Sequence, residues 1–154
     1  MSSLGQGDSD RKDCAANSPV LPADATLEAV REHFKHDRFA SEACGAEIIE
    51  ASFGHAVCRL DIAPIHLNAV GKVMGGALFT LADFALAIAS NLGCSPTVSV
   101  SNTIEFLSAA KGAQLIATAA VDKSGRSLGF YTVDVHDELG THCARMCATC
   151  FRQP

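Results

Sequence analysis

The stretch from Val73 to Leu92 constrains this chain most, because it is apolar on nearly every side of the helix that it predicts. Gly75 and Gly76 open the predicted helix, and Gly93 ends it. A helix with so little polar surface must be enclosed by other elements. A membrane span is the alternative, but a central Asp83 would cost roughly 2.5 to 3.5 kcal/mol in a bilayer, so we predict no membrane span.

Segments on both sides of this helix alternate between apolar and polar residues with the period of a β-strand. Two strands are predicted before the helix and four after it, at 46–52, 56–62, 98–106, 115–121, 127–136 and 141–152. An amphipathic helix precedes them, with Asp24 as its cap and an apolar stripe of Leu27, Val30 and Phe34. This order indicates an α+β fold in which an antiparallel sheet wraps around one long helix.

The length of 154 residues fits a single domain, and a composition of 48% apolar and 19% charged residues is globular. Residues 1–20 are rich in Ser, Gly, Asp and Asn and are predicted to form a disordered tail, so the domain covers 21–154. A formal net charge of −5, with no run of Lys or Arg, argues against a nucleic-acid partner.

The seven cysteines raise the questions of disulfides and of zinc. Their number is odd and the first residues lack the apolar core of a signal peptide, which favours a reducing, cytoplasmic location. Thiolates and imidazole bind zinc, yet alternation along the last strand would put Cys143 and Cys147 on one face and His142 and Cys150 on the other. We therefore predict no metal site and treat these cysteines as packing residues.

Asp83 is the strongest candidate for chemistry, because it is the only charged residue between Val73 and Ile104. An ionised carboxylate is costly in an apolar setting, so such a group indicates a functional site. The alternative is that Asp83 marks the one wet stripe of the helix. Helical geometry places Gly76, Thr80, Asp83 and Ser90 close to one line.

The Gly pair at the start of the helix offers free backbone N–H groups, which suit an oxyanion or a polarised carbonyl. Asp83 lies roughly 10 to 12 Å further along the helix axis than Gly75. If both act on one carbonyl, they come from different chains, which predicts a dimer with sites at its interface. Taken alone, Gly75 and Gly76 would only form a tight turn into the helix.

Three further polar residues are weaker candidates. His66 and Asn68 lie in the loop before the helix, where polar side chains often bond local backbone groups instead. Ser99 alternates with Ser101 on the strand after the helix, and most strand serines merely face solvent. The sequence contains no nucleophile elbow, phosphate-binding loop or dinucleotide fingerprint.

The run from Asn68 to Asp83, followed by Thr103–Leu107 and the Gly125-Arg126 turn, resembles the PaaI-like acyl-CoA thioesterases of the hotdog-fold superfamily. The resemblance covers roughly 45–152. It implies a hotdog fold, in which an antiparallel sheet wraps a long central helix, with the amphipathic helix as an N-terminal addition. It also implies homodimers with their sheets joined edge to edge, and a dimer-of-dimers homotetramer.

The resemblance further implies a role for several residues. Asp83 of the partner chain is the general base or nucleophile, and the amide of Gly75, with Gly76 beside it, polarises the thioester carbonyl. Asn68 helps to hold the water or the leaving thiol. Ser99 corresponds most nearly to the hydroxyl residue that assists the carboxylate.

Where many members of the family have His before the Gly pair, this chain has Met74. Methionine neither donates a hydrogen bond nor titrates, so the role of that His is missing or falls to His66. Arg126 is a candidate for binding a CoA phosphate, although a basic side chain at an exposed turn is commonly just solvated.

The expected function is hydrolysis of acyl-CoA to a carboxylic acid and free CoA, without a metal or a redox cofactor. One alternative is a non-catalytic acyl-CoA binding protein, in which Asp83 is only a polar anchor. Others are a hotdog dehydratase or hydratase on a hydroxyacyl thioester, which Met74 disfavours, and a zinc-dependent interaction module. The acyl group itself cannot be predicted, because pocket shape sets that preference.

Overall fold

The computed structural model describes residues 19–154, so the predicted tail at 1–20 lies almost wholly outside the described residues. All six predicted strands are present in one antiparallel sheet of order β1-β2-β4-β5-β6-β3. The strands are β1 (Ala46–Ser52), β2 (His55–Asp61), β3 (Thr97–Phe106), β4 (Gln114–Ser124), β5 (Leu128–Asp137) and β6 (His142–Arg152). β1 and β3 are therefore the two edge strands.

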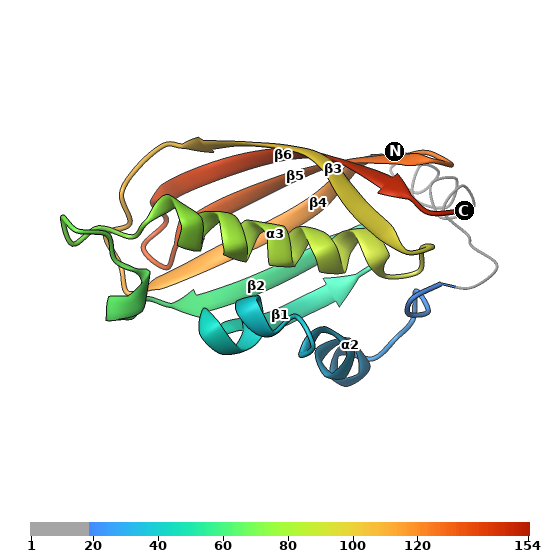
Figure 1. The fold of residues 1–154 in the computed structure, drawn as a ribbon, viewed down its shortest axis with the longest axis horizontal. Coiled ribbons are helices and arrows are strands. Elements are labelled where there is room, and N and C mark those ends of the chain that lie inside the picture. The colour runs from blue at the N-terminus through green and yellow to red at the C-terminus, as the bar shows by residue number, and fades with distance from the viewer. Residues whose placement is uncertain (1–18) are drawn as a thin grey trace, which may run out of the picture.

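The apolar helix α3 (Gly75–Asn91) lies along the inner face of the curved sheet, as predicted (Figure 1). Its side chains Leu81, Leu86 and Ile88 pack against residues of the strands such as Leu115 and Val133, and all five are at most 1% exposed. The sheet wraps around α3 and so removes the apolar surface of this helix from water. The hotdog architecture is confirmed.

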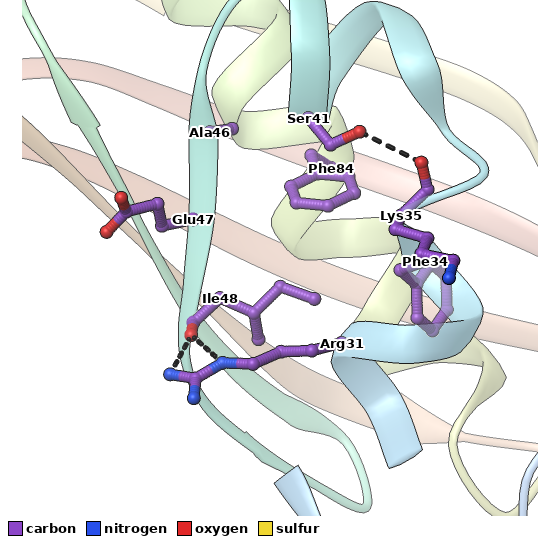
Figure 2. A pocket seen from close by; sticks show the side chains of 8 residues that line it. All are labelled: Arg31, Phe34, Lys35, Ser41, Ala46, Glu47, Ile48 and Phe84. Carbon is purple, nitrogen blue, oxygen red and sulfur yellow. Dashed lines mark hydrogen bonds between the residues drawn. The ribbon is translucent and has the colours of Figure 1, made fainter. Parts of the chain in front are cut away.

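The N-terminal helix α2 (Leu27–Phe34) packs on α3 and on the edge strand β1 (Figure 2). Phe34 makes an edge-to-face contact with Phe84 of α3, and Arg31 donates two hydrogen bonds to the Ile48 carbonyl of β1. The predicted cap, Asp24, is wrong. Asp24 lies in a turn before the helix, and Oγ1 of Thr26 accepts the capping hydrogen bond instead.

Two short helical segments stand where no element is predicted. A π-helix, η1 (Phe39–Ala43), connects α2 to β1, and a single 3-10 turn, η2 (Pro64–His66), follows β2. Both are too short to leave a periodic pattern in the sequence. They matter because they lie beside the exposed side of α3.

Bulges in β3 and in β6 change which side chains face the core. On β6 the register shifts where Val135 and His136 pair with it, so Cys143 is buried while Cys147 is exposed. The prediction that Cys143 and Cys147 share a face is therefore wrong. Cys94 is disulfide-bonded, which the sequence argument for reduced cysteines did not anticipate.

Candidate active site

A single stripe of α3 reaches the surface. Gly76, Thr80, Asp83 and Ala87 are exposed or half-buried, and they recur at intervals of three and four residues along the helix. Ser90, which the sequence places on the same line, is buried and donates a hydrogen bond to the carbonyl of Ala87. Two hollows open beside this stripe, one at Asp83 and the other at Gly75 and Gly76.

The carboxylate hollow has a volume of about 570 Å³ and is lined by Asp83 together with Asp37, Phe39, Phe79 and other residues. Nδ2 of Asn102, on β3, donates a hydrogen bond of 3.3 Å to Oδ1 of Asp83. The carboxylate is thus half-buried, with one amide donor holding it in place. The exposed stripe of α3 and this hollow therefore meet at Asp83.

Burial raises the pKa of Asp83 above its ordinary value. The hydrogen bond from Asn102 favours the ionised form and acts in the opposite direction, whereas the negative charge of Asp37 raises the pKa further. A carboxyl group whose pKa is raised in this way is a better proton acceptor than an exposed Asp once it is ionised.

The amide hollow has a volume of about 530 Å³ and surrounds the first turn of α3. Met74 occupies the N-cap position without a side-chain capping bond, and within residues 19–154 the N–H groups of Gly75 and Gly76 have no acceptor. A Cβ atom at Gly75 would lie 2.8 Å from the ring of Phe106, so a larger residue there would force that ring to move. The hollow therefore presents two free donors at the positive end of a helix.

The two hollows share a wall formed by Phe39, Phe79 and Thr80. Eight helical residues separate Gly75 from Asp83, which corresponds to about 12 Å along the axis. In one chain, therefore, the carboxylate and the amides cannot both lie within 3 Å of a single carbonyl group.

His66 lines the amide hollow, but both of its ring nitrogens are already bonded. Nδ1 accepts a hydrogen bond from the backbone N–H of Ala63, so Nε2 carries the proton that is donated to the carbonyl of Cys44. The ring is 6% exposed. His66 therefore ties η2 to the end of η1, and the structure does not support the suggestion that it replaces the family's His as a substrate donor.

Asn68 stands in the loop before α3, as predicted, with its Oδ1 directed into that loop. It accepts hydrogen bonds from the backbone N–H groups of Val70 and Lys72. The side-chain oxygen of Asn68 therefore bonds backbone groups of its own loop, which is the alternative to a role in substrate binding. Its Nδ2 group takes no part in these bonds.

Within residues 19–154, neither of the two other predicted site residues, Ser99 and Arg126, forms a hydrogen bond with Asp83. Ser99 pairs with Cys150 across the sheet, and it is Asn102, not Ser99, that bonds Asp83. The bulge between Ser99 and Ser101 changes the face of the residues before it, whereas Asn102 shares the inner face with Ile104 by simple alternation, so the sequence pattern could have pointed to Asn102. Arg126 is exposed and lies on the turn between β4 and β5. That turn is at the end of the sheet near the C-terminal end of α3 (Figure 1).

No group of three or more potential metal ligands converges anywhere in the described part of the chain. The same residues include no helix that is both long enough and apolar enough to span a membrane. The chemistry available at the stripe is that of one carboxylate, one amide side chain and two backbone donors.

Comparison with known proteins identifies the class to which this fold and site belong. Residues 70–144 match the model of the family described as "Thioesterase superfamily". Acyl-coenzyme A thioesterase PaaI of Escherichia coli is 34% identical over 105 residues, which cover 65% of this chain and 75% of the relative. Acyl-coenzyme A thioesterase 13 of Homo sapiens is 34% identical over 91 residues, covering 57% of this chain and 65% of the relative.

A solved structure of the Escherichia coli PaaI protein, from the phenylacetic acid degradation operon, superposes with a TM-score of 0.73 at 28% identity. The superposition covers 84% of this chain and 97% of that protein. The chain therefore belongs to the thioesterase superfamily, a class of thioester-hydrolysing enzymes with the hotdog fold. Within that class its relatives are PaaI-like, although it spans just under two thirds of the human relative's length.

Proposed function

We propose that this protein is an acyl-CoA thioesterase, which hydrolyses its substrate to a carboxylic acid and free CoA. The observation that carries the proposal is the exposed stripe of α3, with the carboxylate of Asp83 in one hollow and the free N–H groups of Gly75 and Gly76 in the other. The names of the two thioesterase relatives supply the substrate class.

The proposed reaction needs one base and one oxyanion site. Asp83 takes a proton from water while the water oxygen bonds to the thioester carbon. In the alternative route Asp83 attacks that carbon itself and forms a mixed anhydride as the C–S bond breaks, and a water that hydrolyses the anhydride releases the acid and supplies the proton for the CoA thiolate. Hydrogen bonds from Gly75 and Gly76 stabilise the negative charge that forms on the carbonyl oxygen. The C–S bond then breaks, and the proton goes to the sulfur of CoA. Asn102 keeps the carboxylate in position, and no metal or redox cofactor is required.

The separation of Gly75 from Asp83 along the helix requires a second copy of the chain. We propose a homodimer in which Asp83 of one protomer faces the Gly75 amide of its partner. β3 supports this arrangement, because it is an edge strand with exposed Val98 and Val100 that can pair with a second copy. A dimer-of-dimers tetramer extends the same proposal, as does a cytoplasmic location, since five of the six cysteines in 19–154 are free thiols and Cys94 is the one that is disulfide-bonded.

The test is release of free CoA thiol from acetyl-, hexanoyl-, dodecanoyl- and benzoyl-CoA by the purified full-length chain, with the acid product measured in parallel. We expect equal amounts of thiol and acid from at least one substrate. Tight binding of acyl-CoA without turnover would favour the non-catalytic binding protein. Release of neither product, with no binding, would contradict the proposal altogether.

Replacing Asn102 by Leu is expected to shift the pH dependence of this activity. Without the amide donor, the pKa of Asp83 rises further, and so the ionised base is lost at a higher pH. The acidic limb of the kcat/KM profile moves to higher pH, so the loss of activity relative to the unmodified protein grows as the pH falls. Thr103→Val, on the next and exposed residue, is the control; an unmoved limb in Asn102→Leu would refute the positioning role.

A further inference from the structure

Phe39 is an aromatic residue in an unusual place. It begins the π-helix η1, its side chain is 69% exposed, and it lines both the carboxylate hollow and the amide hollow. Short π-helices are rare and often occur at functional sites. The Phe side chains of the core, such as Phe34 and Phe84, are by contrast almost fully buried.

Other exposed apolar side chains gather around Phe39. Ile65, Met74 and Phe106 line the same amide hollow, and they are 72%, 44% and 55% exposed. Water in contact with so much apolar surface is released when an apolar group enters the hollow. The free N–H groups of Gly75 and Gly76 line the same hollow, so a carbonyl bonded to them would direct its apolar substituent into this space.

The charge of the lining selects which part of a thioester can enter. Among residues 19–154, no Lys or Arg lines the amide hollow. The CoA portion of a thioester carries several phosphate charges and needs cations or water, whereas the acyl group is apolar. The volume of about 530 Å³ is enough for an aromatic ring or a chain of several methylene groups.

We propose that the amide hollow binds the acyl group of the substrate and that Phe39 contacts this group and sets the preference for its size. The inference rests on the proposed thioesterase function, because it takes the carbonyl to be held at Gly75. Phe39 and Gly75 then belong to the same protomer, while the carboxylate comes from the partner. η1 thus acts as a specificity element.

The test compares Phe39→Ala with the unmodified protein and with Leu139→Ala, which removes an equally exposed side chain outside both hollows. For each protein, kcat/KM is measured with dodecanoyl-, benzoyl- and acetyl-CoA. We expect Phe39→Ala to lower the ratio of the larger substrates to acetyl-CoA by at least tenfold, because acetyl has no atoms that reach Phe39. Leu139→Ala should leave this ratio unchanged.

A second variant tests the effect of a larger side chain at position 39. Phe39→Trp narrows the hollow and should shift the preference toward acetyl-CoA. The inference would be overturned if Phe39→Ala changed kcat/KM equally for all substrates or left it unchanged. An altered oligomeric mass in Phe39→Ala would also overturn it, because Phe39 would then contact a second copy of the chain. Absence of turnover in the unmodified protein would instead refute the proposed function itself.

Discussion

Asp83→Asn is expected to lower kcat/KM for every acyl-CoA that the protein hydrolyses by at least about 100-fold. The substitution keeps the shape of the side chain but removes the group that accepts a proton or attacks the carbonyl. Because Nδ2 of Asn102 can still bond to the amide oxygen, the local geometry should persist. Thiol release at pH 7 to 8 measures the effect.

The same substitution should not weaken the fold. Burial raises the pKa of Asp83, so its stabilising contribution is complete only below the pKa of Asp in the unfolded chain and is lost as the pH rises through the folded pKa. At pH 7 the Asn variant should therefore melt at the same temperature as the unmodified protein or above it. A variant that loses activity only by unfolding or dissociating would contradict the assignment.

Asp37→Asn is the matched control, since Asp37 lines the same hollow but lies on the chain between α2 and η1. Removing its charge lowers the pKa of Asp83, because Asp37 is one cause of the raised value. We expect Asp37→Asn to retain turnover, with its acidic limb moved to lower pH. An equal loss in both variants would show that charge in the hollow matters rather than the particular carboxylate.

Leu81→Ala is expected to have the opposite pattern, with a large loss of stability. Leu81 lies two residues before Asp83 on α3, but its side chain is 0% exposed within the core. Deleting a fully buried Leu side chain costs about 2 to 5 kcal/mol in the free energy of unfolding. Denaturant unfolding at a fixed protein concentration measures this cost. The control is Leu139→Ala at an exposed position, whose free energy of unfolding is expected within about 0.5 kcal/mol of that of the unmodified protein.

The molecules that remain folded in Leu81→Ala should keep most of their activity, because the side chain points away from both hollows. A stability close to that of the unmodified protein would mean that the core around α3 collapses into the space, against the close packing seen there. Together the two substitutions separate the two sides of one helix. One side holds the sheet, and the other carries the candidate chemistry.

The elements of this fold follow from local patterns, and so they could be predicted from the sequence. The bounds of α3 come from its Gly residues and its all-round apolar character, and each strand comes from a period of two. The unusual carboxylate was found in the same way, because Asp83 interrupts a long apolar stretch. A charged residue in an apolar helix can be recognised from the sequence alone, without knowing which residues lie near it in space.

Contacts between distant residues could not be predicted in this way. Asn102 reaches Asp83 because β3 packs against α3, and His66 is occupied because the carbonyl of Cys44 lies beside it. Phe39 enters the site through a five-residue π-helix that leaves no periodic pattern.

The sequence by itself determined the architecture and the residue that carries the charge, since periodicity and the cost of burying a carboxylate are local properties. The tertiary structure alone decided which side chain holds that carboxylate and which predicted donors are already bonded. It also decided where an apolar group can enter. Those outcomes depend on packing between segments far apart in the chain, which no local pattern in the sequence records.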